Sequence, residues 1–177
     1  YDLFSRLLKD RVIFIKGRFD ENLADAVTAQ LLFLESQDNE KDIQMYINSP
    51  GGDVDAMFSI FDTMNYIKPD IVTIAYGRAC SAGSFIMAAG TKGKRYALPN
   101  ANIMIHELSG GSQGKFHEME NSYIYSKKLY EKMAEYYVGF TGQDLDTVKE
   151  DMKKDFYMSA EEAKEYGLID HIQDKRK

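Results

Sequence analysis

Cysteine, proline and long apolar runs are scarce in this sequence. Its 177 residues include one cysteine, Cys80, which cannot form a disulfide within the chain, so a reducing compartment is expected. The three prolines are scattered, and no linker, low-complexity tract or internal repeat divides the chain. No apolar run approaches the roughly 18 residues that a membrane-spanning helix needs, and no secretory signal opens the sequence. We therefore expect a cytoplasmic protein with no membrane association.

Basic residues are outnumbered by acidic ones. The chain has 22 lysines and arginines against 28 aspartates and glutamates, a formal net charge of -6, and its short basic run lies at residues 175–177. Since a nucleic-acid-binding surface normally carries a basic patch, we expect no nucleic-acid partner. The length and a hydrophobic content of 44% predict a single globular domain over residues 1–177.

Short β-branched runs alternate with amphipathic stretches along the first two thirds of the chain. We expect strands at residues 11–15, 42–48, 70–76, 94–98 and 102–106. We expect helices that begin near Asp20, Asp53 and Ser81, the first two with apolar residues at helical spacing. Alternation at these lengths implies parallel strands joined by crossover helices, and hence an α/β fold.

The last third of the chain has a different pattern. After a glycine-rich segment at 109–114, a helix is predicted over residues 116–140. At about 1.5 Å per residue it would be roughly 36 Å long, more than the width of a domain of this size. Aromatic and methionine residues recur along it, so we expect its apolar side to dock onto another subunit. A capping box predicts a short helix at 159–167, and a final strand follows at 168–172.

Ser81 lies in the string GRACSAGS, residues 77–84, at a predicted strand-to-helix junction. There a hydroxyl can project into a cleft, and free N–H groups at the helix start can meet developing negative charge. The small residues around it would also let a substrate backbone approach closely. The same residues equally suit a helix that packs tightly against a neighbour, so this string alone does not decide between the two interpretations.

A serine nucleophile requires a base, and the chain has three histidines. His117 and His171 lie in ordinary surface contexts, whereas His106 ends an apolar strand just before a glycine-rich turn. Sites collect at the carboxyl ends of strands in α/β proteins, which favours His106. Taken alone, a structural histidine at the end of a strand explains the same pattern.

The third member of such a set is an acid that orients the histidine. Asp155, between a lysine pair and an apolar run, is one choice, and Asp151 and Asp170 are comparable choices. Residues 49–52, SPGG, end a predicted strand with two glycines. Such a turn either aims a backbone N–H at an oxyanion or simply reverses the chain.

Taken together, several strings resemble the ClpP family, the proteolytic subunits of Clp proteases. They are YDLFSRLLKDR at 1–11, INSPGG at 47–52, KGKRYALP at 92–99, MIH at 104–106 and MSAEEAKEYGLID at 158–170. The resemblance covers practically the whole chain, in order and with similar spacing. It implies a ClpP/crotonase-like α/β fold of repeated ββα units, with a protruding handle region at about 109–140.

The resemblance also implies roles for the residues introduced above. It makes Ser81 the nucleophile, His106 the general base and Asp155 the acid that orients His106. It makes the backbone N–H groups of Gly52 and Ala82 the oxyanion hole. The implied activity is that of a serine endopeptidase, which cleaves peptide bonds through an acyl-enzyme.

Further residues and partners follow from the same resemblance. Gly110 and Gly111 would bind substrate, on a strand that pairs with an extended peptide. Leu32, Tyr46 and Tyr66 fit the outer groove where a Clp ATPase of the AAA+ type docks. The implied assembly is a homo-oligomer of two stacked heptameric rings, joined by the handle helix. The peptidase subunit would need no metal or cofactor, because ATP is used by the partner ATPase.

Five positions depart from the family pattern. Ala82 stands in place of the usual Met, Glu107 and Leu108 in place of Gln and Pro, Lys154 in place of Arg, and Gln44 in place of Tyr. These changes indicate a divergent or second ClpP paralogue, in which ATPase pairing and ring stacking could differ.

Two other functions stay open at this point. The chain could be a catalytically weak or structural ring subunit that supports an active ClpP paralogue. It could also be a crotonase-type acyl-CoA enzyme, because that superfamily shares the architecture and a similar oxyanion hole. Such an enzyme would not need the serine, histidine and aspartate set.

Overall fold

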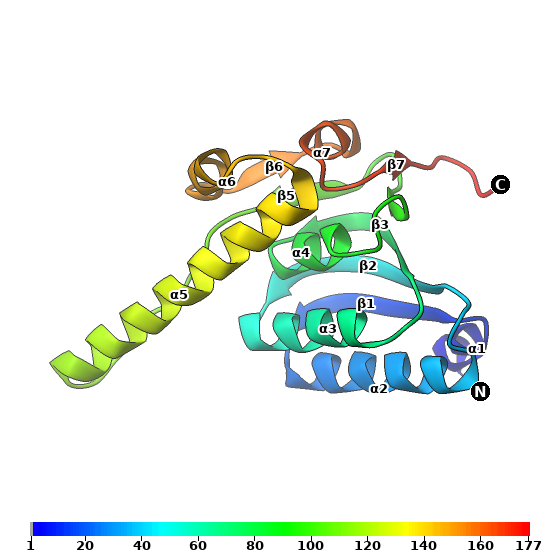
Figure 1. The fold of residues 1–177 in the computed structure, drawn as a ribbon, viewed down its shortest axis with the longest axis horizontal. Coiled ribbons are helices and arrows are strands. Elements are labelled where there is room, and N and C mark those ends of the chain that lie inside the picture. Colours follow the sequence, from blue (N-terminus) through cyan, green and yellow to red (C-terminus); the bar gives the residue numbers. More distant parts are fainter. Residues whose placement is uncertain (1) are drawn as a thin grey trace.

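The computed structural model describes residues 2–177; Tyr1, the first residue of the string at 1–11, lies outside the described part. In chain order the elements are α1 (Leu3–Lys9), β1 (Val12–Phe19), α2 (Glu21–Gln37), β2 (Ile43–Gly52), α3 (Val54–Tyr66), β3 (Ile71–Cys80), α4 (Ala82–Ala88), β4 (Arg95–Ala97), β5 (Asn102–Ile105), α5 (Phe116–Thr141), α6 (Leu145–Met152), β6 (Phe156–Met158), α7 (Ala160–Tyr166) and β7 (His171–Ile172). Figure 1 shows a body of sheet and helices from which α5 projects far to one side. The arrangement confirms the predicted α/β fold with a protruding helix.

The described strands form one sheet. Its order is β1-β2-β3-β4-β7, and β5 pairs with both β3 and β6. The pairs among these strands are parallel, apart from the antiparallel pair of β5 and β6. Helices α2 and α3 are the crossover connections of the first three strands, and they lie against each other (Figure 1). This is the topology that strand–helix alternation predicts.

Helices α2 and α3 begin where they were predicted to begin, and an aspartate caps each of them. Asp20 accepts a hydrogen bond from the Leu23 N–H at 2.8 Å, and Asp53 accepts one from the Ala56 N–H at 2.9 Å. Each side chain thereby satisfies a backbone donor that has no acceptor within the helix. The predicted capping box at the start of α7 is present, and Gly167 ends that helix in the left-handed conformation. Local sequence signals therefore define these boundaries well.

The SPGG segment differs from its prediction. We expected residues 49–52 to turn the chain, but β2 continues through them to Gly52. Across a register shift in β1, Arg18 pairs with Gly51 and Phe19 pairs with Gly52. The bulge bends the strand while keeping it paired, so that both glycines lie at the same end of the sheet as the end of β3.

An aromatic cluster attaches the protruding helix to the body. Phe61 and Phe85 lie 5.1 Å apart between ring centroids, and both rings contact Tyr136 and Phe140 of α5. Phe58 adds a fifth ring. Since Phe61 belongs to α3 and Phe85 to α4, the cluster holds three helices together. Edge-to-face geometry of this kind adds to the stabilisation from burial alone.

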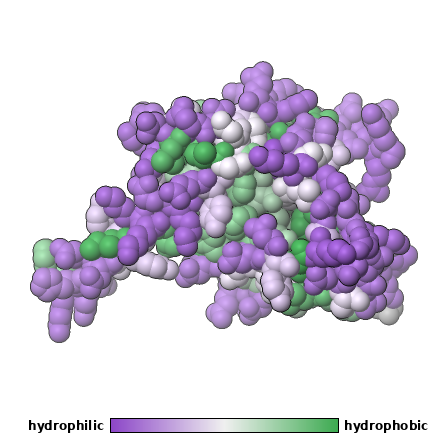
Figure 2. Space-filling model, in the orientation of Figure 1, coloured by the Kyte–Doolittle hydropathy of each residue, from purple (hydrophilic) through white to green (hydrophobic). Residues whose placement is uncertain are grey.

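The N-terminal half of α5 has no such partner in the chain. Its 26 residues correspond to a length of about 39 Å, and its buried residues are Met133, Ala134 and Tyr137, all in the C-terminal half. The exposed large apolar residues of the other half are Phe116, Met119, Tyr123, Ile124 and Tyr125. Figure 2 shows apolar side chains on this projecting arm, whereas much of the visible body surface is hydrophilic.

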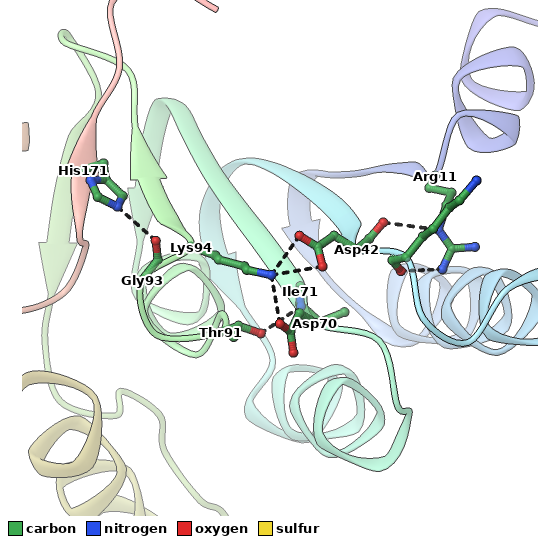
Figure 3. A network of polar contacts seen from close by, with 9 residues as sticks. Arg11, Asp42, Asp70, Ile71, Thr91, Gly93, Lys94 and His171 are labelled. Carbon is green, nitrogen blue, oxygen red and sulfur yellow. Dashed lines mark hydrogen bonds and ion pairs between the residues drawn. The ribbon is translucent and has the colours of Figure 1, made fainter. Parts of the chain in front are cut away.

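A polar network lies at the end of the sheet where β2 and β3 begin, opposite the end at which Ser81 lies (Figure 3). Lys94 Nζ lies 2.9 Å from Asp42 Oδ2 and 2.9 Å from Asp70 Oδ2, just before β2 and β3 begin. The hydrogen bond to Asp70, followed by the one to Asp42, raises the pKa of Lys94. On the far side of Asp42, Arg11 donates to its backbone carbonyl. The network therefore ties the starts of two neighbouring strands together.

Each helix of residues 2–177 is too short or too polar to cross a lipid bilayer.

Candidate active site

Ser81 lies at the junction between β3 and α4, as predicted. Its φ is 56° and its ψ is -118°, a conformation that residues other than glycine rarely adopt. The backbone there is held from both sides, because the Ser81 N–H donates to the Met104 carbonyl at 2.9 Å and the Ser81 carbonyl accepts from the Ser84 hydroxyl at 2.7 Å. Strain of this kind costs on the order of 1–3 kcal/mol and is concentrated at functional sites.

The two glycines that end β2 are both closely surrounded, Gly51 by Ser81 and Gly52 by Phe19. A β-carbon added to Gly51 would come within 2.6 Å of the Ser81 β-carbon, and one on Gly52 would collide with the Phe19 backbone. Only glycine fits at either position, and both have positive φ values. The Gly51 N–H is already used by the Ser49 hydroxyl at 3.0 Å. This leaves Gly52, rather than Gly51, as the glycine predicted to donate to an oxyanion.

Gly51 is a residue whose contribution the sequence did not reveal. The SPGG string indicated glycines for a turn or a donor, whereas the structure gives Gly51 a steric function against the Ser81 side chain. The signal that could have revealed it is the presence of two adjacent glycines, since a single backbone donor requires only one.

His106 and Asp155 are adjacent because of strand pairing. Ile105, the last residue of β5, is the antiparallel partner of Phe156, the first residue of β6. His106 follows one strand end and Asp155 precedes the other, so the two side chains meet, with His106 Nδ1 at 3.1 Å from Asp155 Oδ1. A carboxylate at Nδ1 favours the tautomer with the proton there, which leaves Nε2 free to accept a proton.

The two alternative acids have other partners. Asp151 accepts a hydrogen bond from the Tyr166 hydroxyl at 2.8 Å. Asp170 forms an ion pair with Arg95 at 2.8 Å. Of the three aspartates that the sequence left open, Asp155 is the one in contact with a histidine.

Ser81 and His106 line the same small cavity, of about 50 Å³. Gly52 and Ala82 line it too, so four of the five residues predicted for the catalytic set surround one space, and Asp155 lies behind His106. Within residues 2–177, no hydrogen bond joins Ser81 to His106. Such contacts are often long in the absence of substrate and tighten when substrate binds.

The rest of this cavity has an apolar side. The apolar lining residues are Val54, Met57, Leu108 and Met133. Cys80 lies next to Ser81 and is buried, and burial is the main reason that the pKa of its thiol is raised. The described residues contain no group of three His, Cys, Asp or Glu side chains arranged to hold a metal ion.

Gly110 and Gly111 lie in a segment, residues 106–113, that belongs to no helix or strand. The strand expected here is therefore absent from the chain as described, for a physical reason: no neighbouring strand of this chain supplies hydrogen-bonding partners at that edge. Both glycines are exposed and line a larger cavity of about 530 Å³ between this segment and α5. Open backbone at this place is compatible with binding an extended peptide.

The three residues predicted for ATPase docking are at the surface but do not share one hollow. Tyr46 stacks on Phe14 at 5.5 Å and lines a hollow of about 540 Å³ on the outer side of the sheet. Its hydroxyl accepts a hydrogen bond from Arg176 at 3.0 Å. Leu32, on α2, and Tyr66, at the end of α3, are 42% and 81% exposed and lie outside the lining of that hollow.

A comparison with protein families gives a match over nearly the whole chain. The family model described as Clp protease matches residues 1–176 of the 177 residues.

Proposed function

This chain belongs to the Clp protease family, and from that membership we propose that it is a serine-type endopeptidase subunit with Ser81, His106 and Asp155 as its catalytic triad. The observation that carries the proposal is the 3.1 Å contact of His106 with Asp155 beside the cavity that Ser81 lines. A histidine that contacts a carboxylate and lines the same cavity as a serine supports this assignment, because nucleophilic catalysis by serine needs a base and a group that orients it.

The proposed reaction follows from the positions of the groups. The Nε2 of His106 takes the hydroxyl proton of Ser81 as Oγ attacks the carbonyl carbon of the scissile peptide bond. The resulting oxyanion accepts hydrogen bonds from the backbone N–H groups of Gly52 and Ala82. His106 then gives its proton to the leaving amine, and a water molecule, activated in the same way, hydrolyses the acyl-enzyme. Asp155 keeps His106 in the required tautomer and stabilises its charged form.

Substrate would bind as an extended strand. Gly110 and Gly111 present free backbone beside the small cavity, and main-chain hydrogen bonds of this kind recognise peptides with little regard to most side chains. The proposed substrates are unfolded proteins delivered by an ATPase, and short peptides. The proposed chemistry uses no metal or cofactor in this subunit.

We further propose an assembly of two stacked heptameric rings. The unpartnered apolar half of α5 supports it, because a surface of this kind favours burial against a second copy. A Clp ATPase of the AAA+ type would dock at a groove that includes Leu32, Tyr46 and Tyr66. Since Leu32 and Tyr66 do not line the Tyr46 hollow, such a groove would need a neighbouring subunit to bring them together. The proposed location is the cytoplasm.

One observation favours a second candidate function. The missing hydrogen bond between Ser81 and His106 is what a catalytically weak or structural ring subunit, working beside an active paralogue, would show. Family membership favours both of these functions over an acyl-CoA enzyme.

Labelling with a fluorophosphonate tests the proposal. The reagent should modify Ser81, and Ser81→Ala should abolish both labelling and cleavage of fluorogenic peptides. Ser109→Ala is the matched control, because Ser109 lines the same cavity, and it should retain the label. Label on another residue, or undiminished label in Ser81→Ala, would refute the proposal. Cleavage only after a paralogue is added would select the second candidate.

A further inference from the structure

Glu107 occupies an unusual place next to the candidate site. It follows His106 directly, and its N–H donates to the Met152 carbonyl at 2.8 Å, which fixes its backbone. Its side chain is exposed. It lines both the small cavity at Ser81 and the larger cavity beside Gly110 and Gly111. A peptide that occupied both cavities would therefore lie beside Glu107.

The charge of Glu107 is not balanced within the small cavity. Among the described residues that line this cavity, Glu107 is the only one with a carboxylate, and His106 is the only other titratable one. No hydrogen bond or ion pair to the Glu107 carboxylate occurs within residues 2–177. The carboxylate of Asp155 is nearby, but His106 already uses it.

The lysines near Glu107 form no ion pair with it within residues 2–177. Lys153 is influenced by the charge of Glu107, but its ammonium group hydrogen-bonds to Glu150 at 2.7 Å. In the larger cavity the charges are mixed, because Lys127 and Glu131 both line it, and Glu131 forms an ion pair with Lys149. Of the two glutamates that line these cavities, Glu131 thus has an ion-pair partner, whereas Glu107 has no ion pair within residues 2–177.

We propose that Glu107 makes this subunit prefer peptides with a lysine or arginine next to the scissile bond. The inference rests on the proposed peptidase function, which it extends to a class of substrate. A carboxylate in the path of the peptide attracts an ammonium or guanidinium group as the peptide settles beside Ser81. The preference should be stronger for arginine than for lysine, because a guanidinium can bind a carboxylate with two parallel hydrogen bonds.

The expected preference is modest, because the carboxylate is exposed to water. Exposed ion pairs are weak, so cleavage efficiency should rise by a factor of about two to five. Salt should reduce the preference, since charges at the surface are screened beyond about 10 Å at 0.1 M ionic strength.

The test uses pairs of fluorogenic peptides that differ only in charge. One member carries lysine at a given position beside the scissile bond, and the other carries Nε-acetyl-lysine, which removes the charge. The ratio of the two kcat/KM values is measured for the assembled protein at each of the four positions nearest the bond. For the unmodified protein, the ratio should be about two to five at one or more positions. It should fall to about one in Glu107→Gln and below one in Glu107→Lys.

A matched control removes a charge elsewhere. Glu165 is an exposed glutamate of α7 that lines neither cavity, so Glu165→Gln should keep the ratio of the unmodified protein. A ratio near one in the unmodified protein, or an unchanged ratio in Glu107→Gln, overturns this inference alone while the peptidase function stands. Failure to cleave both peptides, together with no fluorophosphonate label on Ser81, overturns the peptidase function and this preference with it.

Discussion

Gly51 and Ser81 approach each other so closely that the space between them cannot accept a single added carbon. A β-carbon on Gly51 would lie 2.6 Å from the Ser81 β-carbon and 3.1 Å from its Oγ. Gly51, near the end of β2, thus restricts the position of the Ser81 side chain, which lies thirty residues later in the chain, just before α4. Displacing a reacting group by about 1 Å can cost a factor of about 100 in rate.

Gly51→Ala should therefore lower kcat/KM for a fluorogenic peptide by a factor of about 100 or more. The added methyl group must push Ser81 away from its present position. The measurement is steady-state cleavage, with circular dichroism to show that the variant is folded. The control is Gly93→Ala, since Gly93 has a similarly positive φ of 90° but open space around its β-position. If Gly93→Ala loses as much activity, backbone strain rather than the contact with Ser81 is the cause.

Asp155→Asn should lower kcat by about four orders of magnitude, as the equivalent change does in other serine proteases. An amide at this position can donate to His106 Nδ1, and this favours the tautomer that cannot take the serine proton. Peptide cleavage over a range of pH is the measurement. Asp151→Asn, which alters a carboxylate bonded to Tyr166 instead, should keep activity within a factor of about ten. Equal losses in the two variants would remove Asp155 from the triad.

Asp170→Asn should lower the free energy of unfolding by about 3 kcal/mol, because it leaves the buried Arg95 without its ion-pair partner. The side chain of Arg95 is 4% exposed and that of Asp170 is 21% exposed, so screening by water is limited. Urea denaturation of both proteins at pH 7 is the measurement. A difference below about 1 kcal/mol would contradict the prediction.

The same pair gives a dependence on pH. Burial alone would raise the pKa of Asp170, but the hydrogen bond and charge of Arg95 outweigh burial and lower it below 3.8. Above the unfolded-state pKa, near 3.8, the ion pair contributes its full stability, which is lost as the pH falls through the lower pKa of the folded state. Between pH 5 and pH 3 the unmodified protein should therefore lose part of its advantage over Asp170→Asn. A constant difference between the two proteins over this range would contradict the lowered pKa.

Replacing Tyr123 and Ile124 together by serine should halve the mass of the assembled protein. Both side chains are exposed on the unpartnered half of α5, at 67% and 45%, and the proposed contact between rings would bury them. Sedimentation velocity measures the mass. Tyr66→Ser, which changes a residue that is 81% exposed outside the proposed ring contact, should keep the full mass. An unchanged mass in the double variant would place the ring contact elsewhere.

Local signals in the sequence predict much of this fold. Asp20 and Ser159 cap the helices that they were expected to cap, and Asp53 caps the helix that was expected to begin near it, because capping depends on residues within one turn. The long helix and its position outside the body also follow from residue spacing and helix geometry. The extent of β2 was predicted less well, since its continuation through Gly52 depends on pairing with β1.

The acid of the candidate triad shows where prediction from local sequence ends. β6 is only three residues long, too short to produce an alternating pattern, and we did not predict it. Its existence depends on pairing with β5, about 50 residues away, and that pairing brings Asp155 to His106. Without it, Asp151 and Asp170 were equally acceptable from the residues alone. The resemblance to a family supplied the choice that short-range physics could not.

The guanidinium of Arg95 also has a consequence for the order in which the protein can become rigid during synthesis. It donates to the carbonyls of Ala88 and Phe140, at the ends of α4 and α5, and its counter-charge is Asp170, 75 residues further along the chain. A nascent chain released or stalled before that aspartate would have to bury an unpaired positive charge beneath the helix that begins after Ser81. We therefore expect that helix to pack stably only after Asp170 has been synthesised.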